Sequence, residues 1–109
     1  MTADDVRAIV EHEIGTNWAQ KNAHNCDLKN CLVTPSLRDY EDCGGTHPIS
    51  HLPRVVKLWL VLEEFPEDAS GYKVVFDEET REFGLATSTS LHDVYLGPYG
   101  TFLDAFEAM

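Results

Sequence analysis

Cysteine and histidine side chains gather in one stretch of the chain, HNCDLKNCLVTPSLRDYEDCGGTHPISH, residues 24–51. The best set of metal ligands within it is Cys26, Cys31, Cys43 and His47, and zinc prefers these side-chain types. The spacing fits poorly, because zinc sites usually place two cysteines close together, whereas four residues separate Cys26 from Cys31. We therefore expect no cofactor, with zinc on these four residues as the alternative.

The same cysteines could instead act as nucleophiles, which requires a thiol with a lowered pKa. Cys31 lies in the apolar run CLV and is predicted to be a buried core thiol, since free cysteine is among the most buried residue types. Neither Cys26 nor Cys43 lies in a local signature of a cysteine enzyme. We predict no catalytic residue and no enzyme activity.

Carboxylates are the second group that could do chemistry, and they cluster around two expected turns. Acid–base catalysis needs a concave and partly dry site, whereas turns are open to water, so we interpret this group as a solvated acidic edge. A tryptophan on the neighbouring strand could add a contact of short range, unless helices or a second copy of the chain cover it. The predicted binding residues are Trp59, Glu63, Glu64, Glu67, Asp68, Asp77, Glu78 and Glu79.

The charge balance favours a protein partner. Nineteen Asp and Glu oppose eight Lys and Arg, which gives a formal net charge of −11. Such a surface repels phosphate backbones, which argues against nucleic acid, and it attracts basic proteins. The sequence has no apolar run long enough to span a membrane, and an odd number of cysteines without an export signal predicts a cytoplasmic protein.

A first helix is expected after Thr2, which can cap it with Asp5 three residues later. An apolar stripe of Val6, Ile9, Val10 and Ile14 continues it, and Gly15 is a natural stop. Thr101 is expected to cap a short last helix, whose apolar face is Phe102, Leu103 and Phe106. At this length the last helix must dock on a sheet to persist.

Strands are expected between these helices. Residues 29–35 predict a short strand that ends at Pro35, and residues 36–53 predict a long loop. Residues 55–64 predict a central strand with Val56, Leu58, Leu60 and Leu62 on one face and Trp59 and Glu63 on the other. Three more strands at roughly ten-residue steps predict an antiparallel meander. The fold class is a single α+β domain, residues 1–109, with a four- to five-stranded, mainly antiparallel sheet and a helix at each end.

The segments GYKVVFDEE, EFGLAT and LGPYGTFLDAFEAM resemble a family of small uncharacterised bacterial proteins, and DLKNCLVTP adds to this resemblance. The resemblance implies a common fold and transfers no residue role, because these segments consist of turn and core residues. Size and acidity alone are similar to those of toxin-immunity proteins, which bind a cognate toxin. The function expected is non-catalytic binding of a basic protein, with a metal-binding protein or a small-molecule binder as alternatives.

Overall fold

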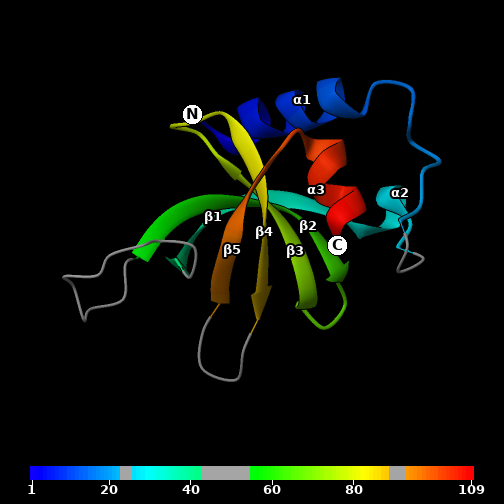
Figure 1. The fold of residues 1–109 in the computed structure, drawn as a ribbon. Coiled ribbons are helices and arrows are strands. Elements are labelled where there is room, and N and C mark those ends of the chain that lie inside the picture. Colours follow the sequence, from blue (N-terminus) through cyan, green and yellow to red (C-terminus); the bar gives the residue numbers. More distant parts are fainter. Residues whose placement is uncertain (23–25, 43–54, 89–92) are drawn as a thin grey trace.

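The computed structural model describes residues 1–22, 26–42, 55–88 and 93–109, and within these ranges the chain is an α+β fold (Figure 1). The predicted fold class is confirmed: the sheet has five strands, mainly antiparallel, with one helix at each end of the chain. The elements in chain order are α1 (Ala3–Ile14), α2 (Leu28–Cys31), β1 (Leu32–Asp42), β2 (Val55–Phe65), β3 (Ser70–Asp77), β4 (Glu82–Ser88), β5 (Asp93–Gly100) and α3 (Phe102–Ala108).

Both terminal helices begin where their capping residues predict. The Thr2 hydroxyl accepts a hydrogen bond from the Asp5 amide at 3.3 Å, and the Asp5 carboxylate accepts one from the Thr2 amide at 2.8 Å. This capping box satisfies two amide groups that the first turn would otherwise leave unpaired. The Thr101 hydroxyl accepts from the Asp104 amide at 3.1 Å in the same manner. Local sequence therefore fixes both helix starts.

The sheet closes on itself. Strands β2 to β5 form the predicted antiparallel meander, and β1 pairs antiparallel with β2. The parallel pairs Glu41–Val94 and Asp42–Tyr95 then join β1 to β5 and complete a barrel. This parallel contact was not predicted, because it joins strands that are distant in the sequence.

The region around β1 differs from its prediction in two ways. Residues 28–31 form the short helix α2 where a strand was expected, with the Asp27 carboxylate accepting from the Lys29 amide at 3.2 Å. Strand β1 does not end at Pro35 but continues to Asp42, so the first part of the expected loop 36–53 is strand. The rest of that loop lies outside the described residues.

Pro35 is tolerated because β1 bulges there. Leu32 pairs with Leu62 and Ser36 pairs with Leu60, so three residues of β1, Val33 to Pro35, lie opposite Val61 alone. A bulge leaves extra residues unpaired, and proline, which has no amide hydrogen, is found in sheets mainly at bulges and edges. The bulge explains why the proline signal at residue 35 predicted a strand end that the structure does not have.

A second irregularity, between β2 and β3, reverses the faces of β2. Leu60 pairs with Val75 and Leu62 pairs with Val74, so Val61 is an extra residue on β2. Leu58 and Leu60 face the interior of the barrel, and Trp59 and Val61 face outward beneath the helices. Beyond Val61 the alternation shifts by one residue, so Leu62 joins the outward core. The prediction that placed Leu62 with Leu58 and Leu60 is wrong, because period-two alternation carries no record of an inserted residue.

The two faces of the sheet form two separate cores. On the outer face, α1 packs mainly over β1 and β2, and α3 packs over β3, β4 and β5 (Figure 1). Phe83 lies between Phe76, whose ring is tilted with its centroid 4.7 Å away, and Phe102, whose ring is edge-on at 5.5 Å. The Glu13 carboxylate accepts from the Phe102 amide at 3.1 Å and so links α1 to the start of α3. The barrel interior is the second core, formed by Tyr40, Leu58, Leu60, Val75 and Ala86.

A buried ion pair lies on the inner face of the barrel. Lys73 and Glu63 are cross-strand partners on β3 and β2, and Nζ lies 3.0 Å from Oε2. The two side chains are 3% and 8% exposed, and Nζ also donates to the carbonyl oxygen of Ala69 at 3.1 Å. Each charge is therefore desolvated and depends on the other for compensation.

We expect Lys73→Met to destabilise the protein by about 3–5 kcal/mol, because it leaves the Glu63 carboxylate buried without a counter-charge. The double variant Lys73→Met/Glu63→Leu should recover most of this loss, and urea denaturation measures both. Lys57→Met is the matched control, since the Lys57–Asp39 pair is 4.0 Å long and exposed, and its effect should stay within about 0.5 kcal/mol. Equal losses for Lys73→Met and Lys57→Met would contradict the argument.

Candidate functional site

The two predicted acidic turns lie at opposite ends of the sheet. The turn between β2 and β3 carries Glu67 and Asp68, and the turn between β3 and β4 carries Glu78 and Glu79. Strand β3 separates them, and its eight residues span roughly 25 Å at the usual rise per residue. The turns therefore do not form one acidic edge, which sequence proximity alone had suggested.

In the folded chain, the start of α1 lies beside the second turn, the one between β3 and β4. The amino group of Met1 lies 3.9 Å from the Glu78 carboxylate, which brings the first turn of α1 beside the turn between β3 and β4 (Figure 1). Hydrogen bonds from the Thr2 amide and hydroxyl hold the pKa of Asp5 below its usual range, so this carboxylate is ionised at neutral pH. We call this group the acidic end: Asp4, Asp5, Asp77, Glu78, Glu79 and Glu82.

Two of the predicted binding residues are not accessible on the surface. The Trp59 side chain lies under the helices and is 8% exposed, and Glu63 is buried in its pair with Lys73. Glu64 is half-buried, and its carboxylate accepts from the Tyr72 amide at 3.2 Å. The shift in β2 accounts for Glu63, because it turns this residue from the outer face to the barrel interior. These positions leave Glu67 and Asp68 as the exposed carboxylates of the first turn.

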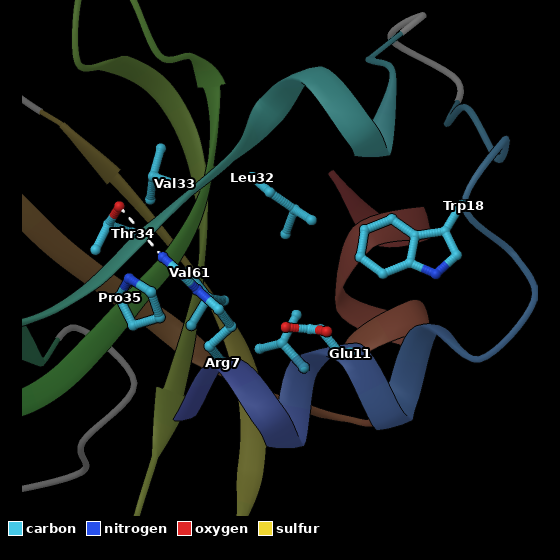
Figure 2. Close-up of a pocket in the computed structure, with 9 residues that line it drawn as sticks. Arg7, Glu11, Trp18, Leu32, Val33, Thr34, Pro35 and Val61 are labelled. Carbon is cyan, nitrogen blue, oxygen red and sulfur yellow. Dashed lines mark hydrogen bonds between the residues drawn. The ribbon is translucent and has the colours of Figure 1, made fainter. Parts of the chain in front are cut away.

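A pocket opens between α1 and the bulged part of β1 (Figure 2). It has a volume of about 260 Å³. Its base is apolar, since Val10 and Val61 are buried and Leu32 and Val33 are half-buried. The bulge creates this space, because Val33, Thr34 and Pro35 share a single partner on β2 and leave the regular path of the strand.

Charged and aromatic side chains form the rim of the pocket. Arg7 and Glu11 project from one side of α1, and the Trp18 ring lies at the far end of the pocket (Figure 2). Arg7 Nη2 donates to the Thr34 hydroxyl at 3.4 Å, a long contact that uses one of five guanidinium donors. Sequence analysis missed these three residues, although the four-residue spacing of Arg7 and Glu11 places them on one helix face.

Two of the candidate zinc ligands are joined to each other. Cys26 and Cys31 form a disulfide, with Cα atoms 6.8 Å apart, that ties α2 to the preceding segment. Both residues are buried in the outer core, as predicted for Cys31, although Cys31 is not a free thiol. Zinc requires thiolates, so the pair would have to be reduced before it could bind a metal. Cys43 and His47, the other two candidate ligands, lie outside the described residues.

Asn22 anchors the same segment to the end of the chain. Its side-chain amide donates to the Phe106 carbonyl oxygen at 3.0 Å, and its side-chain oxygen accepts from the Cys26 amide at 3.1 Å. Gln20 also donates to the Glu107 carboxylate. The disulfide-bonded segment is therefore fastened to α3 by polar contacts at two points.

Two tyrosines give the barrel interior a polar component. Burial, with the charge of Asp93 second, raises the pKa of Tyr40 well above its usual range, and its hydroxyl has no hydrogen-bond partner in the described structure. Burial and the nearby carboxylates raise the pKa of Tyr95 to about 12. The Tyr95 ring lies against Gly84, where a Cβ atom would be only 2.7 Å from the Tyr95 hydroxyl oxygen. Both phenols stay protonated at neutral pH and can act as donors.

Comparisons with protein families, curated proteins and solved structures gave no match. Within residues 1–22, 26–42, 55–88 and 93–109, no group of three or more His, Cys, Asp or Glu side chains is arranged to hold a metal ion. No helix in these ranges is long and apolar enough to cross a membrane. The site is therefore argued from its own geometry.

We expect protein purified without reductant to show one reactive thiol in denaturant, from Cys43, and three after reduction. Alkylation followed by mass spectrometry gives both counts and the pairing. Cys43→Ser is the matched control and should show none before reduction. Cys26→Ser should cost about 2 kcal/mol of stability, the chain-entropy value for so short a loop. Three free thiols before reduction would contradict the disulfide.

The raised pKa of Tyr95 predicts a loss of stability at high pH. The unfolded phenol loses its proton near pH 10, and the folded one only near pH 12. Stability is therefore complete below pH 10 and decreases as the pH rises from 10 toward 12. Urea denaturation at pH 9 and pH 11 should show a smaller decrease for Tyr95→Phe than for the wild type. The same decrease in both proteins would exclude Tyr95 as its source.

Proposed function

We propose that this chain is a non-catalytic binding module that recognises a basic protein through its acidic end. The contact of the Met1 amino group with Glu78 carries this proposal, because it joins two acidic segments that are distant in the sequence. Four of the six carboxylates in the acidic end, those of Asp4, Asp5, Glu79 and Glu82, belong to exposed residues. A concentrated negative field of this kind accelerates the encounter with a positively charged partner.

The burial of the Glu63–Lys73 ion pair supports the proposal, because it shows where the remaining negative charge lies. Of the nineteen Asp and Glu residues, Glu63 is the one that is buried, and Lys73 neutralises it there. The net charge of −11 is therefore carried outside the core, where a partner can meet it.

Two double variants with equal charge change test the acidic end. Glu79→Gln/Glu82→Gln removes two exposed carboxylates from it, and Glu67→Gln/Asp68→Asn removes two from the opposite end of β3. Asp77 is left intact because its carboxylate accepts from the Glu79 amide at 2.9 Å and organises the turn. Each protein is immobilised and exposed to a lysate of its source cell at low salt, and bound proteins are eluted with rising salt.

We expect a basic protein to bind the wild type and the Glu67→Gln/Asp68→Asn variant, and to bind Glu79→Gln/Glu82→Gln at least about 5-fold more weakly. The physical reason is the loss of local charge complementarity at an unchanged total charge between the two variants. Equal weakening in both variants would show that net charge alone attracts the protein. The absence of any salt-sensitive partner in repeated trials would count against the proposed function.

A further inference from the structure

The pocket between α1 and β1 has a combination of groups that the proposed function does not use. One rim presents the Arg7 guanidinium, and Glu11 presents a carboxylate one helical turn further along α1. No ion pair of 4.0 Å or less joins the two side chains, or joins either of them to another described residue. Both charges are thus available to a ligand, at neighbouring positions on one helix face.

The two charges call for a ligand with both signs. A guanidinium binds a carboxylate through paired hydrogen bonds, and a carboxylate binds an ammonium group. Cβ atoms of residues four apart on a helix are about 6 Å apart, which suits charged groups that are separated by very few bonds in the ligand. A carboxylate and an ammonium group on one carbon atom meet this requirement.

The rest of the pocket selects an apolar side chain. Val10, Leu32 and Val61 line the base, and the partly exposed Trp18 ring forms the far wall (Figure 2). A volume of about 260 Å³ lies just below the usual range for small-molecule sites, so the ligand must be small. An aromatic or branched aliphatic group would bury its surface against these residues and could stack on the indole ring.

We propose that this pocket binds a free α-amino acid with an apolar or aromatic side chain, with its carboxylate on Arg7, its ammonium group on Glu11 and its side chain against Val10, Val61 and Trp18. The site is separate from the acidic end, and either function can fail without the other.

L-Phenylalanine, its N-acetyl derivative and its amide are the probes, titrated into ¹⁵N-labelled protein and followed by NMR. Zwitterion recognition predicts saturable shifts of the Trp18 indole and Arg7 side-chain signals with L-phenylalanine. Affinity should fall at least about 10-fold for each blocked derivative. The Trp59 indole is buried outside the pocket lining and serves as an internal control.

Variants assign the two charges. Arg7→Gln should weaken the binding of both L-phenylalanine and the N-acetyl derivative, because each places its carboxylate on Arg7. Glu11→Gln should weaken L-phenylalanine and leave the N-acetyl derivative unchanged. Arg81→Gln, an exposed arginine in the turn between β3 and β4, is the matched control and should change nothing.

Three outcomes would overturn the proposal. The first is an absence of shifts at Trp18 and Arg7 up to 10-fold molar excess at millimolar concentration. The second is equal affinity for the N-acetyl derivative, which would make the pocket a site for a peptide carboxyl terminus. The third is equal affinity for the amide, which would indicate a site for an amino terminus. Thermal unfolding of each variant shows that a lost signal does not come from a lost fold.

Discussion

The irregular pairing of Val61 of β2 with both of its neighbouring strands is the local constraint on which the rest of the structure depends. Three residues of β1, Val33 to Pro35, lie opposite Val61, and this arrangement bends the sheet at the place where it must curl. Val61 is also an extra residue opposite β3, and beyond it Leu62 turns outward to the helices and Glu63 turns inward to Lys73. The pocket opens at the same place, so the buried ion pair and the candidate ligand site both depend on the path of the chain around Val61.

The path of the strands also determines where the charged side chains lie. The buried pair places one positive and one negative charge where their mutual attraction compensates for lost hydration, at no cost in net charge. The other carboxylates remain outside the core, and strand β3 keeps those of its two flanking turns at opposite ends of the sheet. Only one of these ends is reinforced by the first turn of α1, which makes the two ends electrostatically different.

Sequence patterns predicted the parts of the fold that depend on local rules. The caps at Thr2 and Thr101 and the alternation in β3 and β4 each reflect neighbours within a few residues, so the helices and the meander could be predicted. Neither the bulge in β1 nor the extra residue Val61 in β2 could be predicted, because only the partner strands reveal the extra residues. For this reason the sequence placed Leu62 and Glu63 on the wrong faces of β2.

The candidate sites depend still more on tertiary contacts. Arg7 and Glu11 were visible as neighbours on a helix, but part of the apolar base beside them comes from Val61, which lies fifty residues after Glu11 in the sequence. The acidic turns could be recognised from their composition, but their separation depends on the length of β3, which lies between them. Charge and residue type could be read from the sequence, whereas the combination of groups into a site required the fold.

The closure of the barrel has a consequence for how the molecule opens. Two parallel residue pairs join β1 to β5 in the described structure, whereas β1 and β2 share seven. The pairing between β1 and β5 is thus the least extensive in the sheet, and local opening of the barrel would separate these two strands first. Such opening would admit water to Tyr40 and the inner core while α1 and α3 remain seated on the outer face. Opening between these two strands would therefore expose the inner core before the outer one.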